Sequence, residues 1–346
     1  MPDDIAAVEP LDPGADARDY PIVARGLVRR FGTIEAVAGI DLAIRPGEVF
    51  GFLGPNGAGK STTVRMLTTL LRPTEGSAAV AGYDVVAEAD RVRRSIGVAL
   101  QDAAIDPLMT GRELLRLQAI LHGIPKPDAR RRKMELLELV GLMAAADRKV
   151  RTYSGGMRRR LDLALALVHE PKVLFLDEPT TGLDPNSRAV LWDEVRKLNR
   201  ESGATVFLTT QYMEEADQLA GRIAIIDGGK IVAEGTPAHL KSRVGDPTLR
   251  VSIVNADDRL NAEKVLLEFG EPSPDTAEYI AVRLAGGAQQ VAAVSRALED
   301  AKVEVGSLEL RMPTLDDVFQ IATGKRLEGA ETRTEETNDA GTEVAR

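Results

Sequence analysis

A glycine-rich stretch that ends in a lysine and two hydroxyl residues is the part of this chain best suited to do chemistry. It fits the pattern G-x-x-x-x-G-K-[ST] of a phosphate-binding P-loop and comprises Gly54, Pro55, Asn56, Gly57, Ala58, Gly59, Lys60, Ser61 and Thr62. Glycines let backbone N–H groups turn towards phosphate oxygens, and a helix that begins near Lys60 would point the positive end of its dipole at the same place. We expect the Lys60 ammonium to reach the terminal phosphates of a nucleotide and the Ser61 hydroxyl to bind Mg²⁺. The alternative is a glycine-rich turn with an incidental lysine.

Two apolar strands must hold such a loop and its reacting partners. Residues 49–53 read as the buried strand that precedes a P-loop, and residues 172–176 read as a second buried strand that ends in Asp177 and Glu178. The carboxyl ends of parallel strands share one edge of a sheet, so both carboxylates should lie beside the loop. This is a Walker B pattern, in which Asp177 holds Mg²⁺ and Glu178 accepts a proton from the water that attacks the γ-phosphate. The alternative is a solvated strand end.

A second anion-binding pattern precedes that strand. Ser154, Gly155 and Gly156 stand between Tyr153 and Met157, before an apolar-rich helical stretch. A serine and two glycines that open a helix make an anion site by the same dipole argument. Here the chain resembles the ATP-binding cassette (ABC) ATPases, whose signature is usually written LSGGQ, although Tyr153 and Met157 depart from it.

The resemblance implies how the two anion sites work together. In ABC ATPases the signature of one subunit closes on the γ-phosphate held by the P-loop of the other, which implies a homodimer. Three cations, Arg158, Arg159 and Arg160, follow the signature and oppose the helix dipole. An acidic partner or a nucleotide nearby would offset the unfavourable interaction of these cations with the helix dipole. The alternative is that they form a solvated basic turn.

Other family landmarks follow from the resemblance. Phe31 lies where the family has the aromatic A-loop residue that stacks on adenine, and Gln101 lies where it has the Q-loop, with a catalytic and Mg²⁺-binding role. Asp184, in the stretch 182–185, matches the D-loop. On local chemistry alone, Phe31 could equally be an ordinary core aromatic and Gln101 a polar strand end.

One landmark is missing from the chain. After the strand-like residues 205–210 the family usually has a histidine that contacts the γ-phosphate, but this chain has Gln211. A glutamine amide can donate a hydrogen bond to phosphate but cannot carry charge or shuttle a proton. We therefore expect Glu178 to be the base and Gln211 to be a positioning group. The glutamine, together with the 315–319 segment, resembles the daunorubicin/doxorubicin-resistance type of ATP-binding subunit.

The net charge of −9 lies at the two ends of the chain. Residues 1–20 carry a net −5 and residues 327–346 a net −4, so residues 21–326 are neutral overall and offer no basic field to nucleic acid. Both ends have the composition of disordered tails. No apolar run approaches the length of a membrane span, no cysteine is present, and the three histidines have no metal-ligand spacing, so the expected cofactors are ATP and Mg²⁺.

The chain between the tails predicts two domains. We expect an α/β P-loop NTPase fold, the ABC nucleotide-binding domain, over 21–244, with an antiparallel β layer from about 22 to 45 and a helical subdomain over about 103–165. The strand and helix patterns restart after the stretch 244–247 and predict a small C-terminal α+β domain over 245–326. In the 315–319 segment, a capped amphipathic helix explains the local chemistry as well as the family resemblance does.

The resemblance implies an ATP-hydrolysing subunit of an exporter. Separate transmembrane permease subunits would carry a drug-like or lipid-like amphipathic compound, and the ATPase would lie at the cytoplasmic face of the membrane as a peripheral protein. One alternative is a soluble ABC ATPase that acts on nucleic acid or ribosomes, which the neutral core and the single cassette disfavour. The other is a regulatory nucleotide switch with little turnover, which Gln211 favours and Glu178 disfavours.

Overall fold

The structure, a computed structural model, describes residues 19–100, 105–273 and 278–325. These residues form two compact units, one that runs to Pro237 and one that begins at Ala238. The division falls before the boundary expected at 244/245, because nearly all of α8 (Pro237–Val244) groups with the second unit. The predicted acidic tails lie outside the described residues except for Asp19 and Tyr20.

A mostly parallel sheet forms the centre of the first unit. Its strand order is β10-β9-β3-β8-β7-β6, and the β3, β6, β7, β8 and β9 pairs are parallel. Every residue of β3, β7 and β8 is buried, as expected for strands covered on both faces. The strands are β3 (Val49–Leu53), β6 (Ile96–Ala99), β7 (Val173–Asp177), β8 (Thr205–Thr210), β9 (Arg222–Asp227) and β10 (Lys230–Gly235). The carboxyl ends of β3, β7 and β8 therefore adjoin one another.

An antiparallel layer covers the amino-terminal part of the unit, as the sequence predicted. Its strand order is β2-β1-β4-β5, and the strands are β1 (Ile22–Phe31), β2 (Ile34–Ile44), β4 (Glu75–Val80) and β5 (Tyr83–Asp84). One core cluster joins buried residues of this layer to Phe50, Phe52, Phe175 and Phe207 of the central sheet. The aromatic rings of that sheet pack at centroid distances between 5.5 and 5.8 Å.

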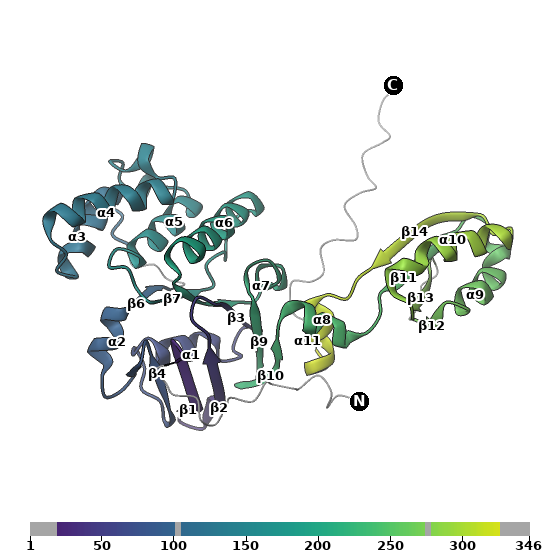
Figure 1. Cartoon of the computed structure of the whole chain (residues 1–346), viewed down its shortest axis with the longest axis horizontal. Helices are drawn as coiled ribbons and strands as arrows, with labels where there is room; N and C mark the ends of the chain where they lie inside the picture. The colour runs from purple at the N-terminus through teal and green to yellow at the C-terminus, as the bar shows by residue number, and fades with distance from the viewer. Residues whose placement is uncertain (1–18, 101–104, 274–277, 326–346) are drawn as a thin grey trace. The chain divides into compact units, whose positions relative to one another are not determined.

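Helices pack around the central sheet and form a subdomain of their own. Figure 1 shows α3, α4 and α5 grouped on one side of β6 and β7, with the antiparallel layer on the other. A second core cluster joins buried residues of the helical subdomain to buried residues of the central sheet and α6. The helices are α1 (Lys60–Leu67), α2 (Ala89–Ser95), α3 (Gly111–Leu121), α4 (Lys126–Leu139), α5 (Gly155–Ala166), α6 (Pro185–Ser202) and α7 (Met213–Leu219).

The second unit is an α+β domain. Its sheet is antiparallel throughout with the order β12-β13-β11-β14, and α9 and α10 give it the βαββαβ element order of ferredoxin-like units. Thr314 caps α11 in a capping box with Asp317, which is the cap that the sequence predicted. The elements are β11 (Thr248–Ile253), α9 (Arg259–Leu267), β12 (Gly270–Pro272), β13 (Ile280–Leu284), α10 (Val291–Asp300), β14 (Val305–Arg311) and α11 (Leu315–Thr323).

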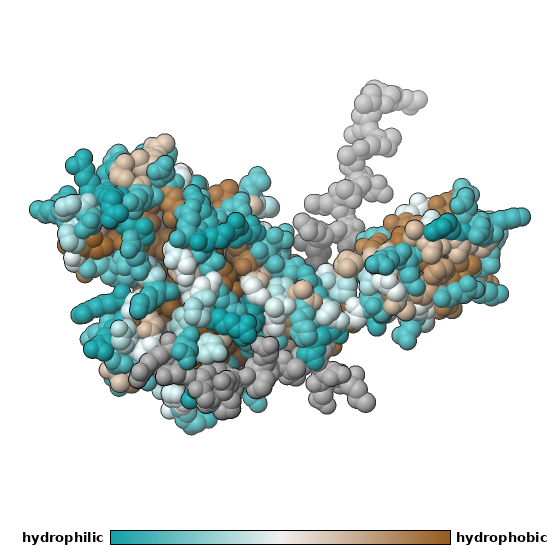
Figure 2. Space-filling view, viewed as in Figure 1, coloured by the Kyte–Doolittle hydropathy of each residue, from teal (hydrophilic) through white to brown (hydrophobic). Residues whose placement is uncertain are grey.

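The described part of the chain contains no helix that is both long and apolar enough to cross a membrane. Most of the surface in Figure 2 is polar, with apolar residues scattered between the polar ones. Exposed apolar side chains in the helical subdomain include Leu117, Ile120 and Leu121 of α3.

Candidate active site

The P-loop connects β3 to α1 at the carboxyl edge of the central sheet. Gly59 has a φ of 110°, in the left-handed region, and a Cβ atom there would lie 2.5 Å from the Ala36 carbonyl oxygen. At Gly54 a Cβ atom would lie 2.3 Å from the Ile226 carbonyl oxygen. Both positions require glycine because the backbone of neighbouring elements approaches so closely. The glycines thus let the loop lie against β2 and β9.

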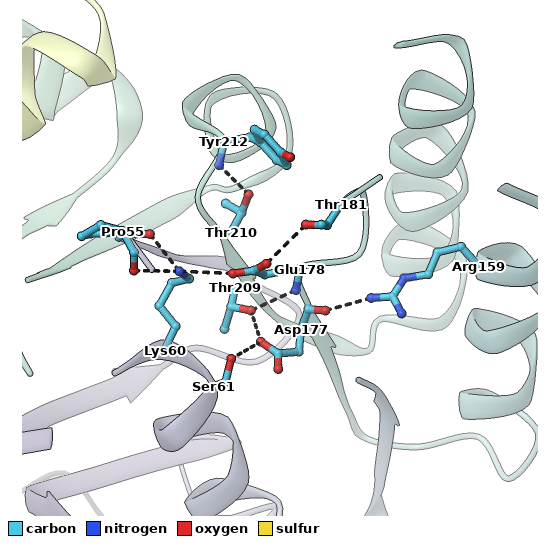
Figure 3. Close-up of polar contacts among 11 residues, drawn as sticks. Pro55, Lys60, Ser61, Arg159, Asp177, Glu178, Thr181, Thr209, Thr210 and Tyr212 are labelled. Atoms are coloured by element: carbon cyan, nitrogen blue, oxygen red, sulfur yellow. Dashed lines mark hydrogen bonds and ion pairs between the residues drawn. The ribbon is translucent and has the colours of Figure 1, made fainter. Parts of the chain in front are cut away.

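The Lys60 side chain lies inside this loop and is almost fully buried. Its Nζ donates hydrogen bonds to the carbonyl oxygens of Gly54, at 2.9 Å, and of Pro55, at 3.1 Å. The same Nζ lies 3.3 Å from Glu178 Oε1, and both side chains are at most 6% exposed (Figure 3). A buried cation is tolerable only with such partners. The P-loop lysine and the Walker B glutamate therefore face the same small volume.

Asp177, the last residue of β7, is joined to the neighbouring strand β8 and to helix α1. Its Oδ1 accepts a hydrogen bond from Thr209 Oγ1 of β8, at 2.5 Å, and from Ser61 Oγ of α1, at 3.2 Å. The structure thus brings together the two residues that the sequence assigned to Mg²⁺ on this edge, Ser61 and Asp177. Thr209 was not predicted, although it is the polar residue that faces Asp177 in the β7–β8 register.

Glu178 adopts an unusual backbone conformation. Its φ of 47° is in the left-handed region, which costs a residue with a Cβ atom roughly 1–2 kcal/mol. The Glu178 amide donates to the carbonyl oxygen and the side-chain hydroxyl of Thr209, both at 3.1 Å. Thr181 Oγ1 lies 3.3 Å from Glu178 Oε2. Backbone strain of this kind persists where surrounding contacts hold it, and it gathers at functional sites.

Gln211, which stands where the family usually has a histidine, lies between β8 and α7 and is half-buried. No hydrogen bond joins its side chain to another described residue. Next to it, Tyr212 packs under Arg188, whose guanidinium carbon lies 4.4 Å from the ring centroid. Glu215 of α7 is fully buried behind this turn and accepts a hydrogen bond from Trp192, and burial raises its pKa.

The signature residues lie at the start of α5. Ser154 is the N-cap and accepts a hydrogen bond from the Met157 amide at 3.2 Å. A Cβ atom on Gly156 would lie 3.0 Å from Ser187 Oγ of α6, so the signature packs closely against the beginning of that helix. Asp184 caps α6 through the Ser187 amide and hydroxyl, and these hydrogen bonds lower the pKa of Asp184. Signature and D-loop therefore form one exposed surface.

The departures from the usual signature have structural reasons. Tyr153 is 3% exposed, and its hydroxyl donates a hydrogen bond to the Ala145 carbonyl oxygen at 2.7 Å, so the ring belongs to the core of the helical subdomain. Met157 is half-buried and packs against the same core.

The alternative of a solvated basic turn after the signature is wrong for two of the three arginines. Arg160 donates to the Val140 carbonyl oxygen at 3.0 Å, and Arg159 is largely buried. Arg158 is exposed, as that alternative expects. Sequence reasoning missed Arg159 because three consecutive arginines look alike until the helix face is known.

The comparisons with known proteins agree with this geometry. Residues 37–181 match the family model described as ABC transporter. The chain is 49% identical over 308 residues to the daunorubicin/doxorubicin resistance ATP-binding protein DrrA of Streptomyces peucetius, across 88% of this chain and 92% of that protein. The chain belongs to the drug-resistance ATP-binding proteins of the ABC family.

Other ABC proteins are similar over different lengths. The linearmycin resistance ATP-binding protein LnrL of Bacillus subtilis is 37% identical over 88% of this chain and 98% of its own length. A dimeric ATP-binding cassette solved in a post-hydrolysis state with ADP and Pi matches with a TM-score of 0.57 and 28% identity, over 62% of this chain and 98% of that one. The predicted P-loop NTPase fold and family are thereby confirmed.

The residues of this ABC cassette fit a nucleotide and its metal. Ser61 and Asp177 offer the hydroxyl and carboxylate oxygens that Mg²⁺ prefers, and the P-loop and Lys60 offer N–H donors and a positive charge to phosphates. Phe31, at the end of β1, is 45% exposed, and the Arg29 guanidinium carbon lies 4.5 Å from its ring centroid. The core alternative for Phe31 is therefore wrong, and the ring is accessible to a base. Gln101 lies outside the described residues.

Proposed function

We propose that this protein is the ATP-hydrolysing subunit of an ABC exporter and that it turns over Mg-ATP at the edge formed by β3, β7 and β8. The observation that carries the proposal is the convergence of Lys60, Asp177 and Glu178 on one buried volume. Lys60 and the P-loop amides bind the phosphates. Asp177 and Ser61 would hold Mg²⁺, directly or through water, and the ion would supply positive charge to offset that of the phosphates. Glu178 accepts the proton of the attacking water.

The test is steady-state ATPase activity of the purified chain with and without the base. Glu178→Gln keeps the shape and removes the proton acceptor, so we expect kcat to fall at least ~100-fold because general-base catalysis contributes 10²–10⁴. Nucleotide affinity should remain close to that of the wild type, and an ATP-bound dimer should accumulate. A Glu178→Gln protein with wild-type turnover would exclude Glu178 as the base.

The active site is completed by a second copy of the chain. The signature residues contact the start of α6 in their own chain, through Gly156 and Ser187, and Ser154 is exposed at the positive end of a helix of 12 residues. We propose that this end closes on the γ-phosphate bound by the partner copy, with Asp184 at the same interface. The dimeric form of the related ADP-bound cassette supports this arrangement.

Transport itself requires separate membrane subunits. No helix in the described ranges could span a bilayer, so the ATPase would act as a peripheral protein on the cytoplasmic face, joined to permease chains. The exposed apolar side chains of α3 offer contacts to such a partner. The names of the two relatives described above include daunorubicin, doxorubicin and linearmycin, and they support an amphipathic drug-like or lipid-like cargo.

A nucleotide switch with slow turnover is the second candidate function. It is favoured by Gln211, because an amide at this place can position the γ-phosphate but cannot share a proton with Glu178. The ATPase assay separates the two candidates. A wild-type chain, assembled with its membrane subunits, that binds Mg-ATP without releasing phosphate would establish the switch.

A further inference from the structure

We propose that Arg159 is a positioning residue for Glu178 and that it joins the signature helix to the catalytic strand. The inference rests on the proposed role of Glu178 as the base. Arg159 does not contact the reacting atoms. It binds the main chain on both sides of the glutamate, from the first turns of α5, and so fixes where the carboxylate can point.

The guanidinium of Arg159 spans three carbonyl oxygens that belong to different parts of the site edge. Nη2 donates to the Asp177 oxygen at 2.8 Å, and Nε donates to the Pro179 oxygen at 2.9 Å. Nη1 donates to the oxygen of Leu100, just after β6, at 2.6 Å. Figure 3 shows the side chain reaching from α5 to the end of β7. A planar fork with fixed donor directions holds all three acceptors at once.

These contacts complete the hydrogen bonding of the main chain around Glu178. The Glu178 amide binds Thr209 and its carbonyl oxygen accepts from the Thr181 amide at 3.3 Å. The peptide carbonyls before and after the glutamate are the ones that Arg159 binds. Because Glu178 has a left-handed φ, its conformation depends on contacts that over-determine it. Arg159 supplies two such contacts from α5, to the main chain on either side of the glutamate.

The environment of Arg159 makes this arrangement rigid. Nη1 also lies 3.1 Å from Asp162 Oδ2, and the two side chains are 11% and 12% exposed. Water competes poorly for buried charge-assisted hydrogen bonds, so the fork has few alternative partners. Lysine would keep the charge but, as a compact point charge, would not span the same acceptors.

Arg159 lies in the same helix as the signature serine, so its contacts link that serine to the main chain around Glu178. Ser154, the N-cap of the same helix, is the residue proposed to meet the γ-phosphate of the partner copy. Movement of α5 when Ser154 binds phosphate is passed by Arg159 to the carbonyls next to Glu178. The base is thus placed correctly when the dimer has closed.

The first experiment compares Arg159→Lys and Arg159→Gln with the wild-type chain in ATPase and nucleotide-binding assays. Misplacing a catalytic group by about 1 Å can cost 10²-fold, so we expect kcat to fall ~10–100-fold for glutamine and less for lysine, with ATP affinity within about threefold. Equal kcat in all three proteins would overturn the proposal. A fall confined to ATP affinity would also overturn it.

The second experiment separates positioning from general structural support. Arg159→Lys is combined with Glu178→Gln. The change in kcat that Arg159→Lys causes in the Glu178→Gln protein is then compared with the change that it causes in the wild-type protein. If Arg159 acts through the carboxylate, the lysine lowers kcat by less than about twofold once the base is gone. If the losses multiply, the arginine acts elsewhere and the proposal fails.

Arg160→Lys is the matched control. Arg160 is the next residue of the same helix. Its guanidinium also binds the main chain, but at the Val140 carbonyl oxygen at the C-terminal end of α4 and not beside Glu178. We expect Arg160→Lys to lower thermal stability by about as much as Arg159→Lys does, but to leave kcat unchanged. If Glu178→Gln alone had no effect on turnover, the proposed role of Glu178 as the base would fail, whereas an effect of Glu178→Gln without any effect of Arg159 variants would overturn only the inference.

Discussion

The P-loop edge and the signature surface are both built from a glycine-rich turn at a helix N-terminus, yet they differ in what surrounds them. Lys60, Asp177 and Glu178 are each less than 10% exposed and linked to one another or to neighbouring strands. Ser154 and Gly155 are exposed, and Ser154 bonds only to its own helix start among the described residues. The first region holds the cation, the carboxylate proposed as the base and the groups proposed as metal ligands, whereas the start of α5 offers only hydrogen-bond donors. The difference supports the proposal that the signature serves a phosphate bound by the partner copy.

The largest expected effect comes from removing the cation of the P-loop edge. Lys60→Ala leaves the phosphate charge without its buried counter-charge, so we expect tight Mg-ATP binding to be lost. Fluorescent-nucleotide titration measures this, with thermal unfolding as the check that the chain is folded. Unchanged affinity would remove the P-loop assignment.

A signature variant should separate binding from turnover. Ser154→Ala removes the cap of α5, at a cost of about 1 kcal/mol in stability, and removes a donor to the γ-phosphate of the partner copy. Hydrogen bonds to charged groups contribute about 1.5–3 kcal/mol, so we expect turnover to fall roughly 10–100-fold while each monomer binds ATP normally. A matching loss of monomer affinity would show that the two regions are not distinct.

Substitutions of Gln211 should have an intermediate effect on turnover, which depends on the hydrogen-bonding chemistry of the new side chain rather than on its size. We expect Gln211→His to retain activity and Gln211→Ala to lose about 10-fold, because alanine leaves the γ-phosphate without that donor. Steady-state kinetics at saturating ATP measures the difference. Unchanged turnover of Gln211→Ala would show that Gln211 does not contribute to catalysis.

The smallest effect concerns stability against acid in the helical subdomain. His122 and His169 stack with centroids 3.8 Å apart, and burial, with the neighbouring His122 and Arg132 charges, lowers the pKa of His169 to about 4. The folded state therefore takes up the proton less readily than the unfolded state, and the stability present above pH 6.5 is lost as the pH falls towards 4.

His169→Gln keeps a donor for the Ile96 carbonyl oxygen and removes the titration. Its unfolding free energy in urea should fall less steeply between pH 6.5 and 4 than that of the wild type, while ATP turnover at neutral pH stays unchanged. A variant with the same acid dependence as the wild type would assign that dependence to other groups.

The sequence could predict the parts of the site that lie in short motifs. Strand-ending carboxylates and a P-loop have fixed places on a parallel sheet, so Lys60, Ser61 and Asp177 were assigned from spacing alone. Thr209 and Arg159 could not be found in this way, because their contacts join segments far apart in the chain. The first depends on the register of β8 against β7 and the second on the packing of α5 against the sheet, and composition encodes neither.

The same reason explains the departures in the signature. Tyr153 and Met157 are mismatches to the linear signature pattern, but Tyr153 lies in the core of the helical subdomain and Met157 packs against it. In the second unit the sequence predicted the α+β class, because the strands and helices have simple periodicity. The sequence did not predict the boundary of this unit before α8, because nothing in the α8 sequence indicates which unit the helix joins.

The central claim, that one active site takes its P-loop from one copy and its signature from another, is tested most directly by mixing two inactive chains. Lys60→Ala protein supplies an intact signature, and Ser154→Ala protein supplies an intact P-loop edge. In a mixed dimer one complete site is restored, so the ATPase rate of an equimolar mixture should rise well above the sum of the two separate rates. A mixture no more active than that sum, with mixed dimers demonstrated by differential tags, would contradict the shared site.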